Sequence, residues 1–222
     1  SHGFSQYDIC VAENVAVLPD GVSFDGAALM DCYACGVHAV NRVPDVSGET
    51  VAIIGAGAIA LTLGQVLKAR GTGRVILIGT RAQPVDVAVE AGAADLGVVT
   101  ADSDPVSAVM NATGGEGAAV VFETVGGRSQ LIQQAVELTR RGGAVSVLGL
   151  FTKAQAVDPA MAMEREVAIR WSNSFSSWNG VSEFSTALNL MASGRVNPDP
   201  IVTHHFGLND IKSVGVNQIQ KL

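Results

Sequence analysis

Residues 50–60, with the sequence TVAIIGAGAIA, constrain the fold of this chain more than any other stretch. An apolar, β-branched run leads into a glycine turn, and an apolar segment with helical spacing follows, which predicts a buried parallel strand, a tight turn and a helix. Gly55 allows the sharp turn. Gly57 has no side chain, so a pyrophosphate can approach the backbone, and Ala60 still permits close packing of helix on strand.

The predicted helix begins at Ile59, directly after Ala58, and its first N–H groups and positive dipole end would face the phosphates. A glycine turn in some other α/β core is the alternative. However, this turn follows one predicted strand and precedes a second at 74–78. We therefore interpret residues 50–60 as a dinucleotide-binding turn.

Strands and helices alternate along the middle of the chain. Because the strands are almost continuously apolar, this order predicts an α/β fold with a doubly wound parallel sheet, the Rossmann arrangement. A ligand should lie beyond the carboxyl ends of the strands. The strands are expected at 50–54, 74–78, 96–100, 118–122, 144–148 and 167–171, and the helices between them at 59–70, 85–91, 104–111 and 129–139.

The two ends of the chain do not follow this alternation. Residues 3–22 are predicted to be a loop with a short apolar strand at 15–18, followed by one helix from Ser23 to about Val43. In the tail, a helix is expected to about residue 193 and another short helix from about residue 208. A glycine turn is expected at 142–143, before the strand at 144–148.

Composition limits the partners and the compartment. The chain has 222 residues, enough for one domain or slightly more. It has 14 Lys and Arg against 21 Asp and Glu, a net charge of −7, and no basic cluster, which argues against nucleic acid or a membrane surface as partner. Three cysteines and no basic-then-apolar leader indicate a reducing, cytoplasmic location. Because the sequence starts at Ser1, it could be a fragment.

Short motifs along almost the whole chain resemble the medium-chain dehydrogenase/reductase family, in its zinc-type alcohol, polyol and threonine dehydrogenase branch. Their spacing and order agree with that branch, whereas quinone reductases have a differently spaced glycine turn. The matching motifs are GFSQY at 3–7, LPDG at 18–21, GETV at 48–51, GAGAIA at 55–60, GAAD at 92–95, TGGEG at 113–117, VFE at 121–123, RGG at 141–143, GLF at 149–151 and ASGRV at 192–196.

The resemblance implies two lobes, a cofactor-binding Rossmann lobe and a GroES-like catalytic lobe. It assigns residues 33–178 to the Rossmann lobe, 1–32 to a remnant of the catalytic lobe and the start of a connecting helix, and 179–222 to a segment returning to that lobe. The family's Gly-His-Glu zinc motif, its four-cysteine zinc loop and its last strand are not found, so no complete catalytic set is expected here.

The end of the second predicted strand bears on the choice of cofactor. NAD sites place an acid there to bind the ribose 2′-hydroxyl, whereas this chain has Gly79, followed by Thr80 and Arg81. Without an acid, a 2′-phosphate is not repelled, and a guanidinium suits phosphate. We therefore favour NADP(H) over NAD(H). Alternatively, Gly79 only turns the chain and Arg81 is solvated.

The resemblance adds cofactor contacts after two later strands: Thr124, Val125, Gly149, Leu150 and Phe151. It also places Asp31 where the family has a third zinc ligand or near-ligand. Asp31 could equally be a solvated or capping helix residue, and it cannot hold zinc alone, since an open catalytic site takes three protein ligands. We expect zinc in the intact enzyme and not in this chain.

Other residues that could carry chemistry have simpler interpretations. Cys32 and Cys35 are spaced like a redox pair, but they lie in a predicted helix and no second pair exists, so structural thiols are favoured. His38 is expected to pack or to lie on the surface. The same is expected of His204 and His205, at the end of an expected strand.

Three functions remain open. The chain is the cofactor half of a zinc-type alcohol or polyol dehydrogenase acting on a small alcohol or carbonyl, a zinc-free reductase of the same superfamily, or a nucleotide-binding module without catalysis. An apolar strand near 167–172 would leave a sheet edge open. By resemblance the family joins sheets there, so a homodimer or homotetramer is expected.

Overall fold

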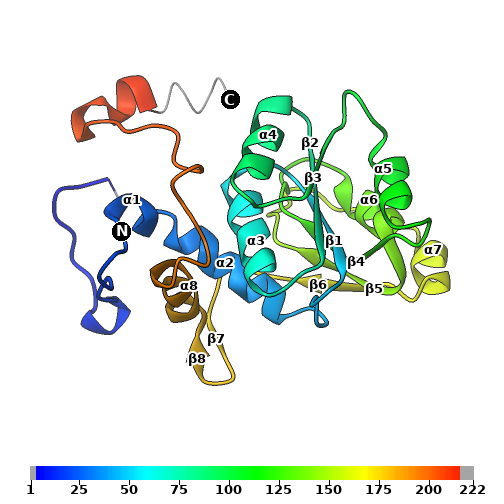
Figure 1. The fold of residues 1–222 in the computed structure, drawn as a ribbon, viewed down its shortest axis with the longest axis horizontal. Coiled ribbons are helices and arrows are strands. Elements are labelled where there is room, and N and C mark those ends of the chain that lie inside the picture. The colour runs from blue at the N-terminus through cyan, green and yellow to red at the C-terminus, as the bar shows by residue number, and fades with distance from the viewer. Residues whose placement is uncertain (1–3, 216–222) are drawn as a thin grey trace.

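The computed structural model describes residues 4–215, and its centre is a six-stranded parallel sheet (Figure 1). The strand order is β3-β2-β1-β4-β5-β6, and every neighbouring pair is parallel. This confirms the doubly wound Rossmann fold. The strands are β1 (Thr50–Ile54), β2 (Arg74–Gly79), β3 (Leu96–Val99), β4 (Ala118–Glu123), β5 (Thr139–Val147) and β6 (Ala168–Trp171).

Helices cover both faces of the sheet because successive strand residues point to opposite sides. Val51 and Ile53 pack with α2, α3, α4 and α8, whereas Ala52 and Ile54 pack with α5 and α6. Each face therefore has its own apolar core. The helices are α1 (Phe24–Ala27), α2 (Met30–Asn41), α3 (Ala58–Ala69), α4 (Ala82–Glu90), α5 (Pro105–Ala112), α6 (Leu131–Leu138), α7 (Pro159–Glu164) and α8 (Glu183–Ala192).

The order of the strands reverses between β1 and β4. From β1 the chain moves outward to β2 and β3, then returns to β4 on the other side of β1. In open parallel sheets, the crevice at such a reversal, beyond the carboxyl ends of the strands, is where ligands bind. The glycine turn that follows β1 lies at this point.

The end segments extend away from the sheet, beyond α2 and α8 (Figure 1). Apolar side chains near the N-terminus are mostly exposed, with Tyr7 at 90% and Ile9 at 98%. Residues 1–3 and 216–222 lie outside the described part of the chain. The expected segment 1–32 and the family motif at 3–7 therefore start outside it, and the expected segment 179–222 ends outside it. No helix between residues 4 and 215 is long and apolar enough to cross a bilayer.

Several local predictions were wrong. The single helix expected over 23–43 is two helices, because the chain leaves helical geometry between α1 and α2. The turn expected at 142–143 lies inside β5, where Gly142 has a φ of +70° and the ladder to β4 is irregular. No strand forms at 15–18; among residues 4–23, a 3-10 turn at Ala12–Asn14 is the only regular element.

The sequence reading also missed two elements: α7, and a hairpin of β7 (Ser177–Trp178) and β8 (Val181–Ser182). Asn179 and Gly180, both with positive φ, form the hairpin's two-residue turn. In the tail, the expected helix from residue 208 is a 3-10 turn, Leu208–Asp210, followed by a π-helical turn, Ile211–Gly215.

Candidate functional site

The turn after β1 admits only glycine at its first position. Gly55 has a φ of +122°, and a Cβ built on it would lie 2.3 Å from Oγ1 of Thr124. That hydroxyl donates to the carbonyl oxygen of Ile54 (2.8 Å), and Gly55 N donates to the carbonyl of Ile78 (2.8 Å). The turn is therefore fixed from both neighbouring strands, as the motif predicts.

Gly57 has a different role. It is the N-cap of α3, with a φ of −89° that any residue adopts, and no atom lies within 4 Å of a Cβ built there. No side chain caps this 12-residue helix, so its first N–H groups face open space. Ala58 is exposed, Ile59 is half-buried and Ala60 is buried against the sheet. The arrangement can bind an anion.

A cavity of about 550 Å³ lies in front of this turn, across the carboxyl ends of β1, β2 and β4. It brings together seven of the residues predicted to contact cofactor: Gly55, Gly57, Gly79, Thr80, Arg81, Thr124 and Val125. The predicted residues Gly149, Leu150 and Phe151 line a second cavity of about 450 Å³. The volume of the first cavity suits a nucleotide-sized ligand.

The sequence reading missed several lining residues: Pro84, Thr100, Ser129, Leu131 and Gln134. Thr100 directly follows β3, so the rule that ligands lie beyond the carboxyl ends of strands could have found it. The other four lie on or beside α4 and α6. Their approach to the turn depends on how those helices pack, which the local pattern does not reveal.

Gly79, the last residue of β2, is buried and closely surrounded. A Cβ on Gly79 would lie 2.6 Å from Cγ2 of Val85 and 3.0 Å from the Cβ of Ala56. An acidic side chain therefore cannot occupy this position unless Val85 moves. Thr80 and Arg81, in contrast, are exposed on the cavity wall. Within residues 4–215, no hydrogen bond or ion pair involves the Arg81 guanidinium.

The candidate metal ligand Asp31 is exposed on the first turn of α2. Among residues 4–215, no three His, Cys, Asp or Glu side chains gather closely enough to hold a metal ion. The Cys32 and Cys35 thiols are half-buried on the same helix. Burial, together with the nearby carboxylate of Asp31, raises the pKa of Cys35 to about 11, and the same causes raise the pKa of Cys32. Both thiols therefore stay protonated and weakly nucleophilic at neutral pH.

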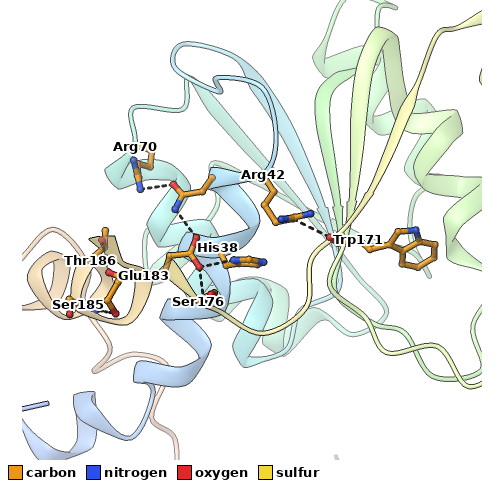
Figure 2. A network of polar contacts seen from close by, with 10 residues as sticks. His38, Arg42, Arg70, Trp171, Ser176, Glu183, Ser185 and Thr186 are labelled. Carbon is orange, nitrogen blue, oxygen red and sulfur yellow. Dashed lines mark hydrogen bonds and ion pairs between the residues drawn. The ribbon is translucent and has the colours of Figure 1, made fainter. Parts of the chain in front are cut away.

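His38 belongs to a buried polar network that the sequence did not indicate (Figure 2). Glu183, at the start of α8, is 1% exposed. Its Oε2 lies 2.6 Å from Nδ1 of His38 and accepts from the N–H of Ser176 (2.8 Å), while Oε1 accepts from Nδ2 of Asn41 (2.9 Å). Asn41 Oδ1 in turn accepts from Arg70 (3.1 Å). One carboxylate thus joins α2, α8 and the segment after β6.

The histidines of the tail lie on the surface. The His204 ring is within hydrogen-bond distance of its neighbour's hydroxyl, at Thr203, and stacks on Phe206. Nδ1 of His205 is 3.6 Å from the Asp25 carboxylate, and both side chains are exposed. No strand forms at residues 201–205, so the strand end expected there is wrong, whereas the surface position is confirmed.

Comparison with known proteins gives one consistent result. A family described as "Zinc-binding dehydrogenase" matches residues 58–193. The chain is 25% identical over 218 residues to a sorbitol dehydrogenase of Bacillus subtilis. The aligned region covers 98% of this chain and 60% of that protein. It is 29% identical over 217 residues to an L-threonine 3-dehydrogenase of Bacillus licheniformis, covering 94% and 59%. The chain thus spans about 60% of the length of these curated relatives.

Among solved structures, the fold matches a putative zinc-binding dehydrogenase from Sinorhizobium meliloti bound to NADP. The TM-score is 0.78 and the sequence identity 27%, and the match covers 89% of this chain and 57% of that one. The six-stranded sheet and the turn after β1 therefore belong to a known architecture.

Proposed function

Because the chain belongs to the zinc-binding dehydrogenases of the medium-chain dehydrogenase/reductase family, we propose that it is the cofactor-binding part of an alcohol or polyol dehydrogenase. The observation that carries this proposal is the open space before Gly57, at a helix N-terminus where the strand order reverses. The lobe boundaries at residues 32 and 178, and a cytoplasmic location based on cysteine usage, are parts of the same proposal.

The residues of this chain supply the cofactor half of a hydride transfer. The turn at Gly55–Gly57 binds the pyrophosphate of a nicotinamide dinucleotide, and the loops after β4 and β5 orient its nicotinamide half. When bound, the nicotinamide ring accepts hydride from an alcohol carbon or donates it to a carbonyl carbon. The described residues do not form a catalytic zinc site, since Asp31 has no partner ligands among them. We expect this chain alone to bind cofactor without oxidising alcohols.

We propose that the cofactor is NADP(H). The position of the ribose-binding acid is filled by Val85 and Ala56, which crowd Gly79. Next to it, Arg81 projects a guanidinium that is not engaged by other described residues. A guanidinium can bind a 2′-phosphate through two parallel hydrogen bonds. The related Sinorhizobium structure, which contains NADP, supports this assignment.

Replacing Arg81 by alanine should weaken NADPH binding about ten- to a hundredfold, because a hydrogen bond to a charged group contributes about 1.5–3 kcal/mol. NADH affinity should change less than about threefold, since NADH has no phosphate there. Calorimetric titration measures both. Arg141→Ala, at an exposed arginine on β5, is the control and should change neither affinity. Equal losses for the two cofactors would contradict the assignment.

From the sequence alone, Gly79→Asp should reverse the preference for NADPH over NADH. However, because Val85 and Ala56 crowd Gly79, this variant would also be strained. The paired variant Gly79→Asp with Val85→Ala removes the closest contact. It should bind NADH more tightly than NADPH, because the carboxylate accepts from the ribose hydroxyls and repels the 2′-phosphate.

We also propose that two copies associate through β6. This strand is the last of the sheet, so one row of its backbone groups faces away from β5, and Trp171, its last residue, is 60% exposed. The carbonyl oxygen of Trp171 already accepts from Nε of Arg42 (3.2 Å). An open edge can pair with a second copy, and two-fold symmetric pairing uses the same strand twice.

Sedimentation velocity at high micromolar concentration should therefore show a dimer, or a tetramer built from dimers. Trp171→Glu should weaken self-association by at least about tenfold, because it places two carboxylates near the shared edge. Val181→Glu, on the exposed hairpin, is the control for an added surface charge and should leave the assembly unchanged. A monomer under these conditions would contradict the proposal.

A further inference from the structure

Glu123 is a fully buried carboxylate that directly precedes the cavity residues Thr124 and Val125, and nothing in the proposed function uses it. It is the last residue of β4 and is 0% exposed. Burying a carboxylate is costly unless hydrogen bonds compensate. Burial raises the pKa of Glu123, and N–H donors from Gly126 and Val125 oppose that rise. Its position therefore calls for a specific explanation.

Glu123 ties together the loops that follow two neighbouring strands. Its Oε1 accepts from the backbone N–H of Val125 (2.8 Å) and Gly126 (2.9 Å), just after β4. Its main-chain oxygen accepts from the N–H of Leu148 (2.8 Å) and Gly149 (3.1 Å), just after β5. One residue thus fixes the start of both loops.

The two loops are also joined directly. Gly127 N donates to the carbonyl of Leu150 (2.8 Å), and Thr152 N donates to the carbonyl of Gly127 (2.9 Å). A Cβ built on Gly149 would lie 2.3 Å from Oε2 of Glu123. The two loops therefore run side by side, and the carboxylate packs closely against Gly149. A shorter side chain would leave the N–H groups of the first loop unpaired.

Two exposed apolar side chains project from these loops. Val125, 49% exposed, lines the cavity in front of the glycine turn, and Leu150, 78% exposed, lines the second cavity. The strand order β2-β1-β4-β5 sets the path of a bound dinucleotide. With the 2′-phosphate at β2 and the pyrophosphate at β1, the nicotinamide half must run past the ends of β4 and β5.

We infer that Glu123 is a positioning residue for the nicotinamide half of the cofactor. Buried beneath both loops, it holds Val125 and Leu150 where they contact that half and does not touch the cofactor itself. This inference rests on the proposed function. It assigns the binding of the two halves of the cofactor to separate parts of the chain, with Arg81 and Gly57 serving the adenine half.

The test compares NADPH with adenosine 2′,5′-bisphosphate, which contains the adenine half alone, by calorimetric titration of the whole chain. Glu123→Asp keeps the charge but shortens the reach, so it should lower NADPH affinity at least about tenfold. Glu123→Gln keeps the length and one acceptor oxygen, so it should retain NADPH affinity within about threefold. Both variants should bind the bisphosphate within about twofold of wild type, which shows that the site is folded.

The outcomes separate the two proposals. If Glu123→Asp loses NADPH and bisphosphate affinity equally, or loses neither, the positioning role is wrong although the cofactor proposal stands. If Glu123→Gln binds NADPH as weakly as Glu123→Asp does, the positioning role is also wrong, because the length of the side chain would then not decide the NADPH affinity. If the wild-type chain binds neither ligand, the cofactor proposal fails and this inference with it.

Discussion

Replacing Gly57 by alanine should lower the affinity for NADPH by about a hundredfold or more while leaving the melting temperature within about 2 °C of wild type. The backbone of Gly57 is already in a conformation that alanine adopts, and the new methyl group meets no atom of residues 4–215 within 4 Å. The only space it takes is the space in front of the α3 N-terminus. A pyrophosphate displaced from that position loses its hydrogen bonds to the helix N–H groups.

The matched control is Gly71→Ala, just beyond the other end of the same helix. Gly71 also has open space around its Cβ position, but its φ is +84°, so alanine there is strained by about 1 kcal/mol. This variant should melt at a lower temperature and bind NADPH as wild type does. Thermal melts and NADPH titrations of the two variants therefore distinguish a loss of cofactor affinity from a loss of stability. Unchanged binding by Gly57→Ala would mean that no phosphate lies there.

The second large effect is expected at Glu183. Glu183→Ala should lower the free energy of unfolding by about 3–5 kcal/mol, because it removes the one carboxylate that pairs with His38, Asn41 and the N–H of Ser176 inside the protein (Figure 2). Urea denaturation at neutral pH measures the change. Glu164→Ala is the control, since this exposed glutamate has no partner in the described part of the chain, and it should cost less than about 0.5 kcal/mol.

The same carboxylate predicts a pH dependence. Burial alone would raise the pKa of Glu183, but hydrogen bonds from Asn41, Ser176 and His38 outweigh it and hold the pKa below its ordinary value of 4.5. A carboxylate with a lowered pKa in the folded state stabilises fully above the unfolded-state value and less as the pH falls through the folded-state value. The stability difference between wild type and Glu183→Ala should therefore shrink below pH 4.5, and a constant difference would contradict this role.

The sheet and its turn could be predicted from the sequence because their signals are local. Each strand is a short apolar run bounded by turn residues, and GAGAIA at 55–60 combines a strand end, a turn and a helix start in six residues. The requirement for glycine at Gly55 follows the same logic. The irregularity in β5 was missed because Gly142 and Gly143 have the composition of a turn, whereas β5 pairs with β4 on both sides of them, at Thr139 and again from Ala144.

The buried polar contacts could not be predicted, because they join residues that are distant in the sequence. His38 and Glu183 are 145 residues apart in the sequence, and either alone looks like an ordinary helix residue. The crowding of Gly79 by Val85 depends on how α4 packs on β2. In the sequence, Glu123 follows an apolar run as a surface acid often does, and its burial depends on how the loops after β4 and β5 pair with each other.

The central claim is that this chain is a dinucleotide-binding domain that selects NADP(H), and titration of the unmodified chain tests it most directly. Isothermal calorimetry with NADPH and with NADH, at the same salt concentration, gives both dissociation constants. The account predicts saturable binding of one NADPH per chain, at least about tenfold tighter than NADH. Equal or tighter binding of NADH would refute the selection of NADP(H), and no binding of either cofactor would refute the claim as a whole.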